Sequence, residues 1–305
     1  MERPYILHLF TPGRQVSPFD VNMAADAGYQ MVVPYNEVGL DAIAGLTQDT
    51  IFSRGPKGVA RTGIFIGGRD PVLATDMLER AKKAMFKPFV VSLMADPSGA
   101  YTTAAAMVAR VESALQHGRQ HTMQARRVLV LGGSGPVGRI AGVMAAQAGA
   151  AVTLTSRGSD AAVAKIASDT GARFGVELQG ASVADRAALR ALLGQCDVVL
   201  CCAAPGAQVL AADDLAYARA LEVAADVNAV PPEGIAGVGV MDDAKPLAGT
   251  DAVGIGALAI GNIKYQTQHR LLVQMREAEK AVTLGVVEAL ATARTVAAEL
   301  AAKPA

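Results

Sequence analysis

The chain has 305 residues, which is enough for two domains, because single hydrophobic cores rarely grow beyond this size. Its 28 basic and 28 acidic side chains give a formal net charge of zero, which argues against a protein that follows nucleic-acid phosphates with a basic face. The composition, with 51% hydrophobic residues, 31 glycines and no tryptophan, favours closely packed helices on a parallel sheet over an aromatic-rich β-sandwich.

The N-terminal part of the chain alternates apolar runs with helical stretches. This alternation predicts βαβ crossovers and a parallel sheet. A turn at residues 96–99 precedes the last of these helices. The predicted strands are 5–10, 31–34, 61–68 and 89–94, and the predicted helices begin at Ser17 or cover 38–46, 70–84 and 102–115.

The N-terminus runs directly into the first predicted strand and lacks the charged, apolar and small-residue sections of a signal peptide. No apolar run reaches the length of a membrane span without charge, Gly or Pro. We therefore expect a cytoplasmic protein with no membrane partner and no nucleic-acid partner.

Cysteine and histidine residues do not suggest a metal site or a disulfide framework. Cys196, Cys201 and Cys202 form no spaced pair, so we expect buried structural thiols and no metal. His8, His117 and His121 match no catalytic pattern, and we expect them to be structural or exposed.

A polar stretch, residues 116–121, interrupts the hydrophobic pattern and is the best candidate for a domain boundary. A second α/β unit begins at Arg127. Near the end of the chain, the glycine-punctuated segment 253–261 leads into further helices, which could cross back onto the first domain. The predicted strands of the second unit are 128–131, 152–155, 198–202 and 221–225, with a short one marked by Val238 and Val240.

The strongest local signal is a glycine-rich turn between the apolar strand 127–131 and the helix 139–147. Gly133 would permit the tight turn, Gly135 would let a pyrophosphate approach the backbone, and Gly138 would let helix and strand pack closely. Free N–H groups at the helix N-terminus would meet the phosphate oxygens. The other reading is a tight βα turn without a ligand. The predicted contacts with a dinucleotide come from Gly133, Ser134, Gly135, Pro136 and Val137.

The fold class expected from these patterns is α/β, with two α/β domains of which the second is a Rossmann-type parallel sheet. We predict an N-terminal substrate-binding domain over 1–120 and a Rossmann-type NADP-binding domain over 121–255. A C-terminal helical segment over 256–305 is predicted to pack on the N-terminal domain.

The end of the second Rossmann strand indicates which nucleotide binds, because an acidic residue there accepts from the ribose 2′-OH and a basic one meets a 2′-phosphate. This chain has Ser156 and Arg157 at that position and no acid. The guanidinium and the hydroxyl favour NADP, with NAD as the second choice. The alternative is that Arg157 is a solvated loop residue.

Two further loops follow predicted strands and are candidates for cofactor contact. Ala203 and Pro205 follow one strand, and Asp226 and Asn228 follow the next, where open α/β sheets bind ligands. A turn at Pro205 and a cap at Asp226 are equally good structural readings. Ala257, in the glycine-punctuated segment, is a further predicted cofactor contact.

Several stretches along the chain match one family pattern, and together they are far more specific than the glycine turn alone. These stretches are the glycine turn and residues 17–22, 62–68, 102–106, 226–232 and 254–268. On these residues, and over nearly its whole length, the chain resembles the bacterial NAD(P)-dependent methylene-tetrahydromethanopterin dehydrogenases of methylotrophs, and more distantly the methylene-tetrahydrofolate dehydrogenases.

The resemblance implies hydride transfer from methylene-tetrahydromethanopterin to NAD(P)+, which gives the methenyl cation in one-carbon (formaldehyde) oxidation. It implies that Phe19 packs on the substrate rings, that Thr103 lines the cleft and that Lys264 is the polar residue of the catalytic pocket. Asp20 is a second polar contact, and Gln268 follows Lys264 by one helical turn. The resemblance also implies a homotrimer.

Two departures from the family limit what is carried over. A histidine stands at the position of Gln268 in the NADP-specific branch, although His269 is adjacent here. Arg157 is unlike the branch that uses either nucleotide. Two other functions stay open: the same reaction on methylene-tetrahydrofolate, and a non-catalytic sensor of NADP(H), which would have lost the pocket residues that this chain retains.

Overall fold

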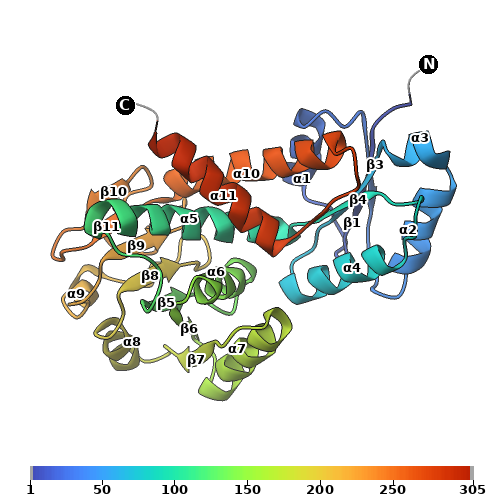
Figure 1. Ribbon diagram of the computed structural model, residues 1–305. Helices are drawn as coiled ribbons and strands as arrows, with labels where there is room; N and C mark the ends of the chain where they lie inside the picture. The colour runs from blue at the N-terminus through green and yellow to red at the C-terminus, as the bar shows by residue number, and fades with distance from the viewer. Residues whose placement is uncertain (1–2, 303–305) are drawn as a thin grey trace. The chain divides into compact units, whose positions relative to one another are not determined.

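The computed structural model describes residues 3–302 and shows an α/β protein (Figure 1). Its backbone contacts divide it into two compact units. Unit 1 holds the described residues up to Thr102 together with 265–292, and unit 2 holds 103–264 and the described residues from Ala293 onward. The predicted fold class, two α/β domains with a Rossmann-type second domain, is confirmed.

Unit 1 contains a sheet of five parallel strands in the order β12-β4-β3-β1-β2. The order reverses between β1 and β3, as in the doubly wound sheets that bind ligands beyond the carboxyl ends of their strands. β3 and β4 are buried throughout, as expected of central parallel strands. The strands are β1 Ile6–Phe10, β2 Met31–Tyr35, β3 Thr62–Ile66, β4 Ser92–Ala95 and β12 Thr283–Leu284.

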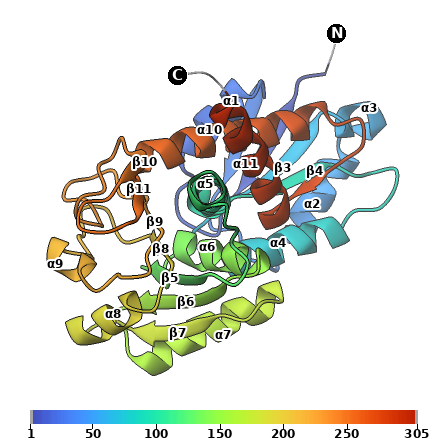
Figure 2. The ribbon, with the colours of Figure 1, turned by 60° about the vertical axis from the view of Figure 1, so that its left-hand side comes forward.

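Helices cover both faces of the unit 1 sheet. α2 and α4 lie side by side on one face and α1 lies on the other (Figures 1 and 2). The Asp70 carboxylate accepts from the backbone N–H groups of Val72 and Leu73 at 2.8 and 3.0 Å, which caps α4. The helices are α1 Pro18–Asp26, α2 Ile43–Phe52, α3 Gly55–Val59, α4 Pro71–Lys83 and the 3₁₀ turn η1 Pro97–Gly99.

Unit 2 contains a seven-stranded sheet in the order β10-β11-β9-β8-β5-β6-β7, in which β10 alone is antiparallel to its neighbour. Without β10 this is the Rossmann order, with the reversal between β5 and β8. The strands are β5 Arg127–Leu131, β6 Ala151–Ser156, β7 Gln179–Ser182, β8 Val198–Cys201, β9 Val223–Asp226, β10 Asp243–Pro246 and β11 Val253–Ile255.

The core of unit 2 forms because alternate strand residues face opposite helix layers. Leu129, Leu131 and Val199 pack against Leu189 and Leu193 of α8. The helices of this unit are α6 Pro136–Gln147, α7 Asp160–Phe174, α8 Arg186–Leu193 and α9 Ala212–Leu215. Three helices have residues in both units: α5 Ala100–Arg119, α10 Ala257–Glu277 and α11 Val286–Ala301.

The structure differs from the sequence-based boundaries in several places. Helix α5 continues to Arg119, and the backbone N–H of His121 closes its end on Leu115, so the polar stretch is a helix end rather than a domain boundary. Residues 38–42 precede α2 as a loop and a turn. The N–H of Val38 bonds to the Thr11 carbonyl at 2.9 Å, and the N–H of Ala42 closes the turn on the Gly39 carbonyl at 3.1 Å. Val238 is buried in a loop, not in a strand.

Of the C-terminal part of the chain, residues 265–292 belong to unit 1, and residues 256–264 and the described residues from Ala293 onward belong to unit 2. The part that belongs to unit 1 includes a strand as well as helices. β12 pairs in parallel with β4 through Leu284 and Met94. A two-residue strand carries no periodicity, so the sequence analysis missed it. α10 begins at Ala257, six residues before the helical start that the sequence suggested near Ile263.

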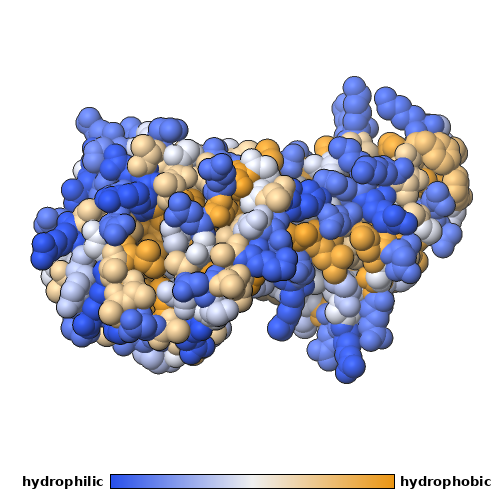
Figure 3. Space-filling model, turned by 90° about the horizontal axis from the view of Figure 1, so that it is seen from below, coloured by the Kyte–Doolittle hydropathy of each residue, from blue (hydrophilic) through white to orange (hydrophobic). Residues whose placement is uncertain are grey.

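The surface carries both charged and apolar side chains. Charged and apolar side chains are interspersed on the face drawn in Figure 3. Within residues 3–302, none of the helices has the length and apolarity that a membrane crossing requires.

Candidate functional site

The glycine-rich turn joins β5 to α6 at the carboxyl edge of the unit 2 sheet. Gly132 takes the left-handed conformation, with φ +69°, one residue before the glycine to which the sequence analysis assigned the tight turn. The N–H of Gly133 donates to the Thr155 carbonyl at 2.7 Å, and Gly135 is the N-cap of α6. The turn is therefore bonded to the neighbouring strand β6 as well as to its own helix.

Close packing explains why Gly133 and Gly138 have no side chain. A Cβ on Gly133 would lie 2.8 Å from the backbone nitrogen of Thr155, and a Cβ on Gly138 would lie 2.6 Å from the carbonyl oxygen of Gly132. The helix-packing role predicted for Gly138 thus agrees with the geometry. A Cβ on Gly135 would meet only the Gly132 oxygen, at 3.3 Å, so the space beside Gly135 is more open.

The start of α6 has the features that a diphosphate needs. Ser134 is exposed, and Pro136 and Val137 of the first helical turn are half-buried. The first N–H groups of a helix lack carbonyl partners within it and carry partial positive charge. This turn fits the pyrophosphate of a dinucleotide.

The turn touches the loop that follows β8. A Cβ on Gly132 would lie 2.6 Å from the Cys202 carbonyl oxygen and 2.9 Å from the Cα of Ala203. β5 and β8 flank the reversal of strand order, so this contact lies at the position where Rossmann sheets bind dinucleotides. Ala203 is half-buried there and Pro205 is exposed.

Arg157 directly follows β6 and is exposed. Among residues 3–302, no hydrogen bond or ion pair holds its guanidinium. The hydroxyl of the half-buried Ser156 accepts from the backbone N–H of Gly158 at 3.2 Å, which shapes the loop. The nearby carboxylate of Asp160 accepts from the Ser182 N–H at 2.7 Å. The loop therefore offers an unengaged cation where a nucleotide ribose would lie.

Asp226, at the end of β9, is 1% exposed and accepts backbone hydrogen bonds from its own loop. Its donors are the N–H groups of Asn228 at 3.0 Å, Gly234 at 2.7 Å and Ile235 at 3.2 Å. Burial raises the pKa of the Asp226 carboxyl, and these backbone donors oppose the shift. This carboxylate stabilises the loop that follows β9. The sequence analysis gave such a capping role as one of two interpretations of Asp226.

Asn228 connects the loops after β8 and β9. Its Oδ1 accepts from the N–H groups of Gly206 at 3.2 Å and Val230 at 3.0 Å, and its Nδ2 donates to the Pro232 carbonyl at 2.9 Å. The structure thus brings Asp226 and Asn228 together as loop supports. Sequence reasoning missed Gly234, where a Cβ would lie 2.6 Å from the Cys201 Sγ.

Helix α10 carries Ala257 and Lys264, two of the predicted site residues. Ala257 is its first residue, directly after β11 and Gly256. A Cβ on Gly256 would lie 2.1 Å from the Gly239 carbonyl oxygen, so only glycine lets α10 start here. Lys264 lies two turns further on and is half-buried.

In unit 1 the structure brings Asp20 and Gln268 together. The Gln268 Nε2 donates to the Asp20 Oδ1 at 2.9 Å, and the two residues are 0% and 5% exposed respectively. Phe19, the residue before Asp20 on α1, is 45% exposed. This contact joins residues 248 positions apart, which no sequence spacing could indicate.

The start of α5 places Thr103 just after a buried cap. Asp96 is 0% exposed and accepts from the backbone N–H groups of Tyr101 and Thr102 at 2.9 and 3.2 Å, and from the Thr102 hydroxyl at 2.6 Å. The sequence analysis treated Asp96 only as part of a turn. Thr103 is half-buried and belongs, with Lys264, to unit 2, whereas Phe19, Asp20 and Gln268 belong to unit 1.

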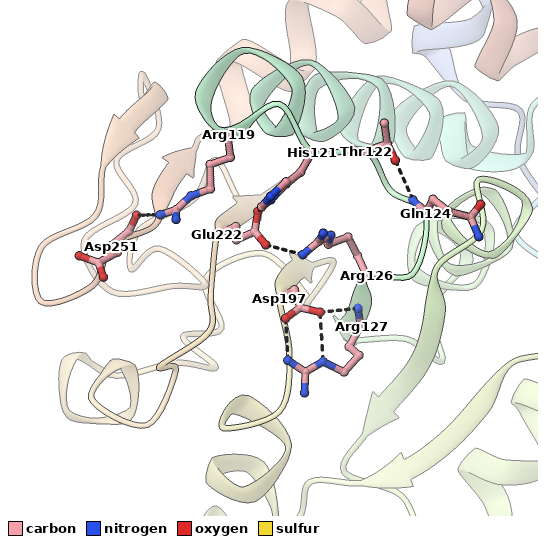
Figure 4. A network of polar contacts seen from close by, with 9 residues as sticks. All are labelled: Arg119, His121, Thr122, Gln124, Arg126, Arg127, Asp197, Glu222 and Asp251. Carbon is pink, nitrogen blue, oxygen red and sulfur yellow. Dashed lines mark hydrogen bonds and ion pairs between the residues drawn. The ribbon is translucent and has the colours of Figure 1, made fainter.

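A polar network lies at the opposite, amino edge of the unit 2 sheet (Figure 4). The Glu222 carboxylate contacts the His121 Nδ1 at 2.7 Å and accepts from Arg126 at 2.8 Å. Arg127 donates to Asp197 with its Nε at 3.0 Å, its Nη2 at 2.6 Å and its backbone N–H at 2.8 Å. His121 is structural, as predicted. In the described part of the chain, no cluster of three His, Cys, Asp or Glu could hold a metal ion.

Comparison with known proteins shows which family the chain resembles in sequence. A model of the N-terminal part of methylene-tetrahydromethanopterin dehydrogenase matches residues 18–98. The chain is 45% identical over 292 residues to the NAD(P)-dependent methylenetetrahydromethanopterin dehydrogenase of Methylorubrum extorquens, across 96% of this chain and 98% of that protein. It is 33% identical over 277 residues to the bifunctional protein MdtA of the same organism, across 91% and 94%.

Among the solved structures that the comparison matches is shikimate 5-dehydrogenase of Listeria monocytogenes. It is 14% identical, with a TM-score of 0.49, and the alignment covers 91% of this chain and 93% of that one. The assignment of the fold rests on the strand orders, and the assignment of the family rests on sequence identity along almost the entire chain. By that identity, the chain belongs to the family of NAD(P)-dependent methylene-tetrahydromethanopterin dehydrogenases.

Proposed function

We propose that this protein transfers hydride from methylene-tetrahydromethanopterin to NAD(P)+ and gives the methenyl form in one-carbon (formaldehyde) oxidation. The observation that carries the proposal is the 45% identity, over 96% of the chain, to a relative named for that activity. The glycine turn at the switch point of a Rossmann sheet supports the cofactor half of the proposal.

The nicotinamide nucleotide, when bound, supplies the hydride acceptor at C4 of its ring. The backbone from Gly133 to Val137 would hold the diphosphate against the start of α6. The segments around Ala203, Pro205 and Ala257 would border the nucleotide. Asn228 would support the loop after β8 through the N–H of Gly206, and Asp226 would hold its own loop after β9.

NADP is the proposed preferred nucleotide, and NAD is the second choice. The exposed Arg157 guanidinium can donate two parallel hydrogen bonds to a 2′-phosphate, and the Ser156 hydroxyl lies beside it in sequence. The Asp160 carboxylate is engaged by the Ser182 backbone, which supports a site for a phosphate rather than for a free ribose.

The substrate half of the site is proposed to consist of Phe19, Thr103, Lys264, Asp20 and Gln268. Hydride transfer from a methylene carbon between two nitrogens needs no proton transfer, since the nitrogen lone pairs stabilise the cation that forms. The protein's tasks are therefore to hold the two carbons in close approach and to exclude water from the product cation. The exposed ring of Phe19 is suited to stack on a flat substrate.

A spectrophotometric assay of purified protein tests the function. NADP+ and NAD+ reduction are each followed at the nicotinamide absorbance with methylene-tetrahydromethanopterin and, in parallel, with methylene-tetrahydrofolate. We expect turnover with the methanopterin substrate and a higher kcat/KM for NADP+. Faster turnover of the folate would reassign the substrate, and nucleotide binding without turnover of either would indicate a sensor.

We also propose a cytoplasmic homotrimer, which the family resemblance supports. Sedimentation equilibrium of the purified protein measures the assembly directly. A monomer at micromolar concentration would contradict it.

A further inference from the structure

We propose that Asp20 is the carboxylate that stabilises the positive charge formed on the pterin as hydride leaves, and that Gln268 is the positioning residue that holds this carboxylate. The inference rests on the proposed function, because it assigns roles within the hydride-transfer step. It is carried by the buried contact between α1 and α10.

The location of Asp20 suits a ligand-facing residue. Asp20 lies in the first turn of α1, which follows β1, and β1 borders the reversal of strand order in the unit 1 sheet. Ligands of doubly wound sheets bind beyond the carboxyl ends of the strands at this reversal. The preceding residue, Phe19, is 45% exposed, so one helical turn carries an exposed ring and a buried carboxylate.

The hydrogen bond from Gln268 fixes the direction of this carboxylate. Its Nε2 lies 2.9 Å from the Asp20 Oδ1, and the Gln268 side chain is fully buried, so the amide cannot swing away into solvent. An amide donor orients a carboxylate without adding a charge of its own. A protonated histidine or a lysine in its place would cancel part of the negative charge.

Helix geometry connects this pair with the proposed catalytic lysine. Gln268 follows Lys264 by four residues on the continuous helix α10, so the two side chains lie on the same face of that helix. One face of α10 therefore carries both the pocket lysine that the family resemblance indicates and the amide that holds Asp20.

The charge balance of the reaction explains why a fixed carboxylate helps. The methylene C–H bond of the substrate would break, and its hydrogen would leave with both electrons to the nicotinamide that the bound cofactor would supply. No proton would be released, and the positive charge lost by the nicotinamide would appear on the N–C–N group of the pterin. A carboxylate beside the pterin attracts the pterin more strongly once the positive charge forms on it. Because this attraction grows toward the transition state, it lowers the barrier to hydride transfer.

The decisive variant is Asp20→Asn, because asparagine keeps the acceptor for Gln268 and removes the charge. Binding of the methenyl cation and of the neutral methylene substrate is measured by titration, and kcat and the isotope effect with methylene-deuterated substrate are measured by absorbance. We expect the cation to bind about tenfold more weakly, the neutral substrate to change less than about twofold, and kcat to fall about 10- to 100-fold with a larger isotope effect.

The chain offers matched controls on the same helices. Asp26→Asn is the control for Asp20→Asn, because Asp26 is exposed at the end of α1. Gln274→Ala is the control for Gln268→Ala, because Gln274 is exposed on α10 and Gln268 is buried. We expect the controls to match wild type and Gln268→Ala to reproduce the Asp20→Asn pattern more weakly. Melting temperatures measured in parallel report any loss of folding.

The outcomes separate the two proposals. Suppose that the wild-type protein turns over the substrate, but Asp20→Asn weakens the binding of the cation and of the neutral ligand equally, or weakens the binding of neither. The role proposed for Asp20 is then wrong, and the proposed function stands. If wild type shows no turnover with methylene-tetrahydromethanopterin, both proposals are overturned.

Discussion

The Cα of Gly138 lies so close to Gly132 that a Cβ there would come within 2.6 Å of the Gly132 carbonyl oxygen. The first turn of α6 and the glycine turn before it are thus fitted to each other without room for a methyl group. The neighbouring atoms are backbone, which cannot rotate away as a side chain could.

Gly138→Ala should therefore displace the turn that is proposed to hold the diphosphate. We expect the free energy of unfolding to fall by about 1–3 kcal/mol and NADP+ to bind at least about tenfold more weakly. Gly118→Ala, in a helix where a Cβ would meet no atom within 4 Å, is the control and should be stabilising by about 0.5–1 kcal/mol. Urea unfolding measures the free energy of unfolding, and nucleotide titration measures the affinity for NADP+. If Gly138→Ala and Gly118→Ala gave the same two values, the packing argument would be contradicted.

Arg157→Ala should change nucleotide selectivity. A charge-assisted contact with the 2′-phosphate contributes about 1.5–3 kcal/mol, so NADP+ should bind roughly 10- to 100-fold more weakly while NAD+ changes little. Lys165→Ala removes the same charge from the exposed side of α7 and should leave both affinities near wild type. Equal losses for the two nucleotides would remove the 2′-phosphate argument.

Lys264→Ala should separate binding from chemistry. Lys264 is proposed to contact the pterin and not the nucleotide diphosphate, so we expect NADP+ affinity within about twofold of wild type and kcat at least about 100-fold lower. The exposed Lys280 provides the control, and Lys280→Ala should retain wild-type kcat. Unchanged methylene-pterin oxidation in Lys264→Ala would show that the residue has no catalytic role.

The Arg127–Asp197 pair should make the protein sensitive to acid. Burial pushes the pKa of the Asp197 carboxyl upward, but hydrogen bonds and charge from Arg127 outweigh it and hold the pKa below its usual value. A carboxyl with a depressed folded pKa contributes stability above its unfolded pKa, near 4, and that stability is lost as the pH falls through the lower folded value.

Urea unfolding at pH 7 and at about pH 3 measures this contribution. We expect Asp197→Asn to lower the free energy of unfolding by roughly 1–3 kcal/mol at pH 7, and to lower it less at the acid pH. Asp169→Asn is the control, because its exposed pair with Lys165 should contribute only about 0.3–0.5 kcal/mol. A pH-independent loss in Asp197→Asn would show that the ion pair is not the cause.

Local sequence signals predicted much of unit 2, which carries the glycine turn. The apolar run before Gly133, the glycines and the following helix are contiguous, so their order alone indicated a Rossmann turn, and the strand order confirms that fold. Arg157 was found from its place at the end of the second predicted strand of that unit. The family resemblance, rather than any spacing, indicated Phe19, Thr103 and Lys264.

Signals that span the chain were not visible in the sequence. The two-residue strand β12 has no pattern of its own and forms because β4 offers an edge to pair with. Glycine at 234 and at 256 is explained only by atoms of distant residues, namely Cys201 and Gly239. The end of α5 resembled a domain boundary because a polar helix end and a polar linker have the same composition.

The sequence by itself determined the alternation of strands and helices, the position of the glycine turn and the cation after β6, because each depends on residues within one turn or strand of each other. Only the tertiary structure decided that Gln268 holds Asp20, that Asp226 supports its own loop and that the last strand joins the first sheet. Those contacts depend on side chains that chain folding brings together from distant positions, and no local propensity encodes them.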